Sequence, residues 1–245
     1  MLLQAVWNYE SLQGLGFGWS LLPALERIYP DPRERARRLH VHLGVFNSNP
    51  YLATLGMGVA IRVEEEIARG RGAEEGLARL LKALRGTLGA LGDELFWVAL
   101  RPALGLSAAL VALIAPSPWP AAAFLVVFNA VAQGVRWGGV RVGFTSGAGI
   151  ARVLQSPAWH RAGVAARTLG AFAAGAALGT GAVMAFSSHG GLPGAGIFSG
   201  LVALLWLAGL RFGSRRRLLS PALAFLALVI LLSAIFHLRP GALPW

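Results

Sequence analysis

A polar turn flanked by aromatic rings is the first candidate site in the chain. Residues 46–51, FNSNPY, place two amides and a hydroxyl beside Phe and Tyr. This mixture of hydrogen-bonding groups and apolar surface suits a polyhydroxylated ligand. The residues also fit a tight turn between helices, because Pro50 disfavours helix at Asn49 and Asn49 can cap the next helix. The residues alone leave both interpretations open.

A second candidate lies in residues 84–103, LRGTLGALGDELFWVALRPA. Asp93 and Glu94 are the last acidic residues of the chain, since residues 95–245 contain neither Asp nor Glu. We expect the glycines between residues 89 and 92 to form a turn that folds the N-terminal helices back onto the first membrane span. We also expect Arg101, two turns on, to pair with Asp93 or Glu94, to meet a partner subunit or to lie at the membrane interface.

No catalytic or metal-binding constellation accompanies these two stretches. Cysteine is absent, and the five histidines are scattered; His40 and His42 point to different faces of a helix. The chain has no Gly-Lys-Ser nucleotide loop, and the Gly14–Gly18 repeat follows no strand, so it favours close helix packing. The sequence therefore predicts no catalytic residue, no metal and no cofactor.

The composition indicates a membrane protein. Hydrophobic residues make up 56% of the 245 residues and charged residues 13%, with a mean hydropathy of +0.60. The net charge of +11 lies entirely in residues 95–245, because residues 1–94 hold 11 basic and 11 acidic residues. Arginine between long apolar segments is typical of membrane topology, and this distribution argues against a nucleic-acid partner.

Residues 1–92 are expected to form an amphipathic helical region that packs on itself and on the membrane. Asp31 and Pro32 predict the start of a helix that runs to about residue 46. Leucines at helical spacing predict an amphipathic helix over residues 74–91. The run Glu64–Glu66 is interpreted as a solvated face.

Residues 93–245 are expected to form the transmembrane region. A span needs about 20 residues, and five candidates are apolar enough: 96–115, 119–135, 168–187, 197–212 and 218–236. Arginine is concentrated in residues 136–167 and 211–217, so the positive-inside rule predicts a cytoplasmic N-terminus and a C-terminus outside. The apolar run 142–150 is compatible with a re-entrant segment.

The predicted fold is therefore an all-α polytopic membrane protein, in which N-terminal amphipathic or re-entrant helices precede about five membrane helices. No span beyond residue 94 contains a carboxylate. Ion-coupled carriers usually keep ionisable groups within their spans. Any energy for transport is accordingly expected to come from other proteins.

Several short motifs occur in a distinctive order over residues 10–105. They are LQGLGF at 12–17, LLPAL at 21–25, YPD at 29–31, HLGVFNSNPYL at 42–52, EEE at 64–66, and GALGD, LFW and LRP between 89 and 102. In order and approximate spacing the series resembles the IID membrane component of the mannose/fructose/sorbose family of the bacterial sugar phosphotransferase system. Residues beyond 105 resemble it only in their hydrophobic pattern.

This resemblance implies a non-catalytic subunit of a phosphoenolpyruvate-dependent sugar phosphotransferase in the bacterial inner membrane. Family members pair with a IIC component, and the pairs form trimers. The pair binds a hexose from outside and carries it across, and IIB, phosphorylated by IIA, then phosphorylates the sugar. The partners expected for this chain are thus IIC, IIA and IIB, a hexose and the lipid bilayer.

The resemblance also selects candidate substrate-binding residues. Asn47 and Asp93 are expected to face the sugar or to gate it, with Phe46 and Trp97 as apolar walls. Asn49 in the same turn and Gln13 in the first motif complete the set.

Three positions depart from the family pattern. The family often has Phe where Val45 stands, His or Gln where Asn49 stands, and Ser where Glu94 stands. A carboxylate beside Asp93 could change the choice of ligand. It also motivates an alternative function, a non-transporting assembly or regulatory subunit of a related complex.

Overall fold

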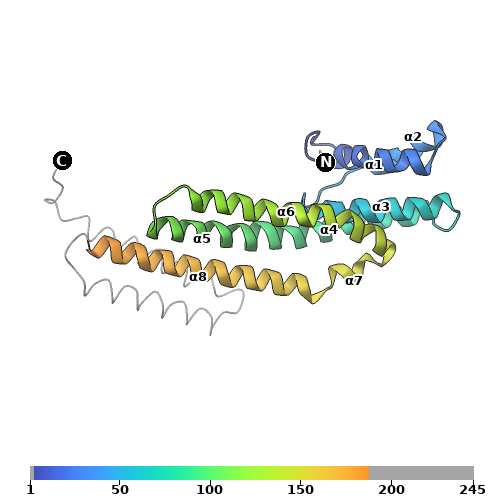
Figure 1. Cartoon of the computed structure of the whole chain (residues 1–245). Helices are drawn as coiled ribbons and strands as arrows, with labels where there is room; N and C mark the ends of the chain where they lie inside the picture. Colours follow the sequence, from blue (N-terminus) through green and yellow to red (C-terminus); the bar gives the residue numbers. More distant parts are fainter. Residues whose placement is uncertain (1–2, 188–245) are drawn as a thin grey trace. The chain divides into compact units, whose positions relative to one another are not determined.

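Helices make up most of residues 3–187, the part of the chain that the computed structural model describes. This part contains only isolated β-bridges and no β-strand, which confirms the predicted all-α fold. The helices are α1 (Gly14–Ile28), α2 (Pro32–His42), α3 (Ala53–Ala68), α4 (Glu74–Gly92), the π-helix η1 (Asp93–Leu100), α5 (Arg101–Ile114), α6 (Trp119–Ser146), the 3₁₀-helix η2 (Gly147–Ile150), α7 (Ala151–Leu154) and α8 (Pro157–Ser187). Figure 1 shows their course.

The start of α2 forms as the sequence predicts. The Asp31 carboxylate accepts the backbone N–H groups of Arg33 at 3.4 Å and Glu34 at 3.2 Å, and Pro32 occupies the first helical position. The predicted end near residue 46 is wrong, because α2 stops at His42. The chain leaves the helix there because residue 46 pairs through its backbone with the segment before α1.

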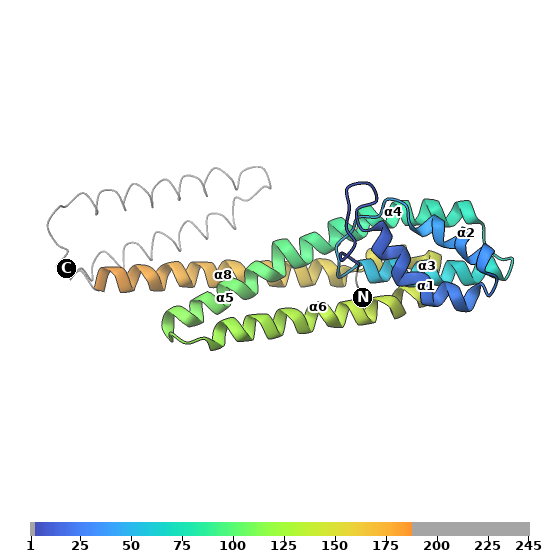
Figure 2. The same ribbon diagram turned by 90° about the horizontal axis from the view of Figure 1, so that it is seen from above.

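Helix α1 packs closely against its neighbours, as its glycine repeat predicted. A Cβ atom on Gly14 would collide with the backbone of Gly44, and one on Gly16 with the backbone of Leu3. Its apolar face contributes Phe17, Leu21 and other residues to a core shared with α3 and α4. The two views in Figures 1 and 2 show α1 lying along α3.

Helices α4, η1 and α5 form one continuous helix of 41 residues, Glu74–Ile114. The predicted leucine stripe is confirmed, since Leu77, Leu81, Leu84 and Leu88 are buried. The turn expected between Gly89 and Gly92 is wrong: both glycines are helical, and a π-helix follows them. A π-helix replaces i→i+4 hydrogen bonds by i→i+5 bonds without ending the helix, and such segments are frequent at functional sites.

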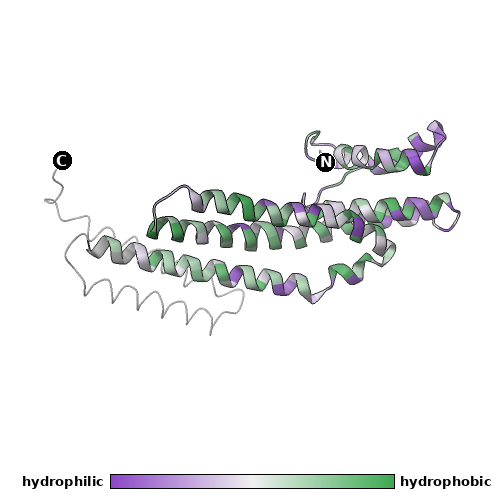
Figure 3. Cartoon of the chain, viewed as in Figure 1, coloured by the Kyte–Doolittle hydropathy of each residue, from purple (hydrophilic) through white to green (hydrophobic). Residues whose placement is uncertain are grey.

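Three of the described helices are long and apolar enough to cross a membrane: Glu74–Ile114, Trp119–Leu154 and Pro157–Gly181. Only 11–17% of their most apolar windows is buried. Apolar surface exposed along whole helices favours contact with lipid. In Figure 3 the hydrophobic colours follow α5 and α6, whereas hydrophilic ones gather around α2.

The helices agree with the first three predicted spans in position but not in length. The charge-free turn before α6 is confirmed. Residues 136–146, expected in a loop or a re-entrant segment, instead continue α6 to Ser146. They pack on α3, where a Cβ on Gly58 or Gly143 would collide with the backbone of the other helix. The predicted spans 197–212 and 218–236 lie outside the described residues.

By packing, the chain divides into two compact units, Met1–Ala173 and Ala174–Trp245. All candidate site residues belong to the first unit. The boundary predicted between residues 92 and 93 concerns exposure to water and to lipid, and it stays a prediction.

Candidate functional site

The turn at residues 46–51, here called the polar loop, is held by the segment that precedes α1. The Gln13 backbone N–H donates to the Phe46 carbonyl at 2.8 Å, and the Phe46 N–H donates to the Ser11 carbonyl at 3.2 Å. The buried Gln13 amide forms hydrogen bonds with both backbone groups of Ser48. Its Nε2 donates to the carbonyl at 2.9 Å, and its Oε1 accepts from the N–H at 3.0 Å. Gln13 thereby fixes the position of the polar loop.

Asn49 joins the polar loop to the long helix. Its Nδ2 donates to Asp93 Oδ1 at 2.9 Å, while its Oδ1 accepts the Tyr51 N–H at 3.0 Å. The second bond forms a turn within the loop, in place of the predicted helix cap, because α3 begins only at Ala53 and has no side-chain cap. A Cβ on Gly92 would overlap the Asn49 side chain. Glycine at this position therefore lets the Asn49 amide reach Asp93.

Three predicted residues remain at the surface around this contact. Asn47 and Asp93 are exposed, and Trp97 is 37% exposed. The Trp97 ring lies 5.6 Å from that of Tyr51, between centroids. The Asp93 carboxylate and the Trp97 ring thus lie beside the polar loop, on which the Asn47 amide is also exposed. The carboxylate and the amides can accept hydrogen bonds from hydroxyls, the amides can also donate to them, and the aromatic ring can stack on an apolar ligand face. These residues include no nucleophile with an activating base.

Phe46 is buried and does not form a wall that faces a ligand. It is 4% exposed and stacks on Phe17 of α1, with ring centroids 4.1 Å apart. The structure thus places all six predicted residues at or against the polar loop. Two of them, Gln13 and Phe46, support it from the interior, and Asn49 connects it to Asp93.

Of the three roles expected for Arg101, pairing with Asp93 or Glu94 is wrong. Asp93 accepts the hydrogen bond from Asn49, and Glu94 pairs with Arg167 of α8, with Nη1 and Oε1 2.8 Å apart. The Arg101 guanidinium lies over the Trp97 ring, 5.5 Å from its centroid. A cation over an aromatic face is attracted by the ring quadrupole, so Arg101 steadies Trp97.

A buried cluster of charged and polar side chains lies at the centre of the N-terminal helices. The Glu64 carboxylate accepts hydrogen bonds from Arg38 Nε and Nη2, each at 2.9 Å, and from the Tyr29 hydroxyl at 2.8 Å. His42 Nε2 lies 2.7 Å from Glu64 Oε1. Arg38 Nη1 lies 3.0 Å from Glu74 Oε2 without hydrogen-bond alignment. The side chains of Tyr29, Arg38, His42 and Glu64 thereby connect α1 and α2 to α3.

Burial alone would raise the pKa of the Glu64 carboxyl, but the hydrogen bonds with His42 and Tyr29 and the charge of Arg38 lower it. Burial and the neighbouring Glu64 carboxylate raise the pKa of the Tyr29 hydroxyl. Glu64 is therefore ionised and Tyr29 neutral at ordinary pH, which is the charge state that the cluster needs.

The interpretation of Glu64–Glu66 as a solvated face is wrong for Glu64, which is fully buried. Glu65 and Glu66 are partly exposed and form i,i+4 pairs with Arg69 and Arg62. The spacing of Arg38 and His42, four residues apart on one helical face, is the sequence signal that could have indicated an inward polar face.

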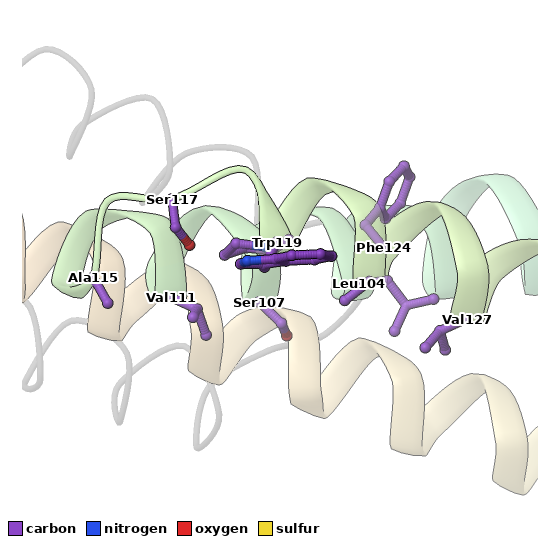
Figure 4. A pocket seen from close by; sticks show the side chains of 11 residues that line it. Leu104, Ser107, Val111, Ala115, Ser117, Trp119, Phe124 and Val127 are labelled. Carbon is purple, nitrogen blue, oxygen red and sulfur yellow. The ribbon is translucent and has the colours of Figure 1, made fainter.

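Two cavities in the described part of the chain lie apart from the predicted site residues, none of which lines either of them. The larger, about 400 Å³, lies between α5 and α6 and is mostly apolar (Figure 4). The smaller, about 210 Å³, lies between η1 and the start of α8 and includes Glu94. The candidate site is thus a surface patch of this chain. Among residues 3–187, no group of three or more His, Cys, Asp or Glu side chains could hold a metal ion.

Comparison with known proteins finds relatives for most of the chain. It is 33% identical over 177 residues to the mannose-specific EIID component of Escherichia coli K12, covering 71% of this chain and 62% of that protein. It is 34% identical over 179 residues to the sorbose-specific EIID component of Klebsiella pneumoniae, covering 71% and 64%. The chain thus spans less than two thirds of the length of these relatives.

A solved structure of the mannose transporter ManYZ in complex with microcin E492 shares the fold. The TM-score is 0.55 at 24% identity, covering 99% of this chain and 94% of the other. The model of the mannose/fructose/sorbose family IID component of the phosphotransferase system matches residues 1–192. This match covers more than half of the sequence, and the chain therefore belongs to that IID family.

Proposed function

We propose that the chain is the IID membrane subunit of a sugar phosphotransferase permease in the bacterial inner membrane. With a IIC partner it moves a hexose of the mannose type across the membrane. Phosphorylation of the sugar by the IIA and IIB components drives the uptake. Family membership and the names of the relatives support this function.

The Asn49–Asp93 hydrogen bond carries the proposal. It joins two motif segments that lie 44 residues apart in the sequence. Asn47 of the polar loop and Asp93 and Trp97 of η1 are all exposed. Carboxylate and amide groups beside an aromatic face are suited to a hexose, which offers hydroxyls at its rim and C–H groups on its faces.

The partner completes the sugar site in this proposal. The candidate residues form an open patch, whereas sugar-sized ligands bind in sites that bury most of their surface. A IIC subunit that covers Asn47, Asp93 and Trp97 supplies the opposite wall. Trimers of IIC–IID pairs, a cytoplasmic N-terminus and an outer C-terminus belong to the same proposal.

Membrane vesicles test this function. Vesicles that contain this chain and its IIC partner, supplied with the soluble components, are expected to phosphorylate hexose at the expense of phosphoenolpyruvate. Vesicles that lack this chain are expected to lose that activity, and unchanged activity would contradict the proposal. A complex with IIC that assembles but shows no affinity for hexose would support the non-transporting alternative instead.

A further inference from the structure

The chain reversal between α6 and α8 is rich in arginine and lacks acidic residues. Residues 136–167 contain five arginines, and no Asp or Glu follows Glu94 in the sequence. One candidate span ends at Leu154 and the next begins at Pro157. A reversal between two spans lies at one face of the bilayer, where positive charge meets the lipid headgroups.

Three of these arginines are available to a ligand. Arg141 of α6, Arg152 of α7 and Arg161 of α8 are all exposed. Within residues 3–187 none of the three forms an ion pair or a side-chain hydrogen bond. Arg167, by contrast, is engaged by Glu94. Each free guanidinium presents a planar set of donors that matches a phosphate group in two-point contact.

The surroundings of these arginines favour lipid over a protein partner. Val142 and Val164, next to this surface on α6 and α8, are 39% and 43% exposed. Trp137, one helical turn before Arg141, is 82% exposed. Tryptophan and exposed aliphatic side chains beside basic residues are typical of the boundary between headgroups and acyl chains.

The opposite end of α6 has a different character. The turn of residues 115–118 carries no charge, and only Trp119 and small or apolar residues lie there. The two ends of the same helix thus differ in charge but share an exposed tryptophan. This asymmetry favours a specific attraction to anionic lipid at the arginine end.

We propose that Arg141, Arg152 and Arg161 form an anionic-lipid surface, which binds the phosphate groups of acidic phospholipids such as phosphatidylglycerol. Its role is to hold the reversal between α6 and α8 at the headgroup layer. The proposal requires only that the two helices cross the bilayer, and it does not depend on sugar transport.

Lipid binding by the purified full-length protein in mixed micelles tests the proposal, with phosphatidylglycerol and phosphatidylcholine as probes. The wild type is expected to prefer phosphatidylglycerol, and the preference is expected to weaken with salt. The triple variant Arg141→Gln, Arg152→Gln, Arg161→Gln is expected to bind phosphatidylglycerol roughly 100-fold more weakly. The corresponding triple substitution to Lys is expected to keep most of the binding, which separates loss of charge from loss of folding.

A matched control removes three exposed arginines elsewhere, by Arg33→Gln, Arg71→Gln and Arg79→Gln. It is expected to keep the preference of the wild type. Equal affinity for the two lipids, or an equal loss in both triple glutamine variants, would overturn the proposal. It would also be overturned if the first variant kept its lipid preference but lost binding to a phosphorylated soluble component, since the surface would then serve a protein partner.

Discussion

Two glutamate–arginine pairs of equal length lie in opposite environments in this chain. Arg38 and Glu64 approach to 2.8 Å, as do Arg167 and Glu94. The side chains of the first pair are 0% and 1% exposed, whereas those of the second are 36% and 52% exposed. The first pair links α2 to α3, and the second links η1 to α8.

Burial, rather than distance, therefore decides what each pair does. A buried charge that loses its partner keeps its desolvation cost, whereas an exposed one is resolvated by water. The N-terminal helices thus depend on their ion pair for integrity. The region around η1 carries its charges at the surface, where a ligand or a partner can reach them.

The largest effect is expected from Glu64→Ala, which leaves Arg38 buried without its carboxylate. Loss of one partner of a buried pair costs about 3–5 kcal/mol. Thermal unfolding of the purified protein in detergent, followed by circular dichroism, should show a much lower midpoint than in the wild type. Glu94→Ala is the matched control and should change the midpoint little. Similar midpoints for the two variants would contradict the role given to burial.

The contact between α3 and α6 extends the comparison to packing. Gly143→Leu places a side chain against the α3 backbone and should destabilise the protein by ~3 kcal/mol, as overpacking does. A Cβ atom at Gly138, on the same helix, would have no atom within 4 Å, so Gly138→Leu is the control. It should leave the unfolding midpoint near that of the wild type. A large loss in the control would show that leucine disturbs α6 itself.

Acidification should reveal the contribution of the buried pair without a change of side-chain volume. Because the pKa of Glu64 is lowered on folding, the stability from its ionised form is present above the ordinary carboxyl value of 4.5. That stability is lost as the pH falls through the lowered pKa. A series of unfolding midpoints below pH 4.5 should therefore fall more steeply in the wild type than in Glu64→Gln. Parallel curves would show that Glu64 contributes no such dependence.

The smallest effect is expected from Arg167→Gln. Exposed ion pairs contribute about 0–1 kcal/mol, so the unfolding midpoint should move only slightly. Arg167→Gln should not raise the salt sensitivity of hexose uptake more than Glu94→Gln does, because both variants remove the same ion pair. Measurement of hexose uptake at low and high salt with each variant checks this. A marked loss of stability in Arg167→Gln alone would mean that Arg167 has a structural role beyond Glu94.

Local rules predicted much of the fold. The Asp31 cap and the leucine stripe of α4 involve neighbours in the sequence, so their outcome is visible in the residues themselves. The glycines at 89 and 92 led to the wrong prediction of a turn, because glycine also occurs where a helix comes close to another segment. Gly92 lies in a helix, and its missing side chain makes room for Asn49, a long-range contact that leaves no local signature.

The sequence indicated residues that the structure gathers at the polar loop, but it did not indicate how they are arranged there. The motif series placed the polar loop and Asp93 in one candidate set, and the structure brings them into contact. The motif series did not indicate that Gln13 and Phe46 support the loop from inside, since their burial depends on the packing of α1. Glu64 was assigned to the solvent for the same reason, because only the docking of α2 on α3 brings Arg38 to it.

The rate of phosphoenolpyruvate-dependent hexose phosphorylation by vesicles that carry Asp93→Asn tests the proposed function most directly. Asparagine at 93 can still accept the Asn49 hydrogen bond, so the polar loop should stay in place while the charge is lost. Hydrogen bonds to charged groups contribute about 1.5–3 kcal/mol, so a decrease of roughly ten-fold or more is expected. Glu75→Gln, which removes an exposed charge at the start of α4, should keep the rate of the wild type. Equal rates in the two variants would contradict a role of Asp93 in sugar binding.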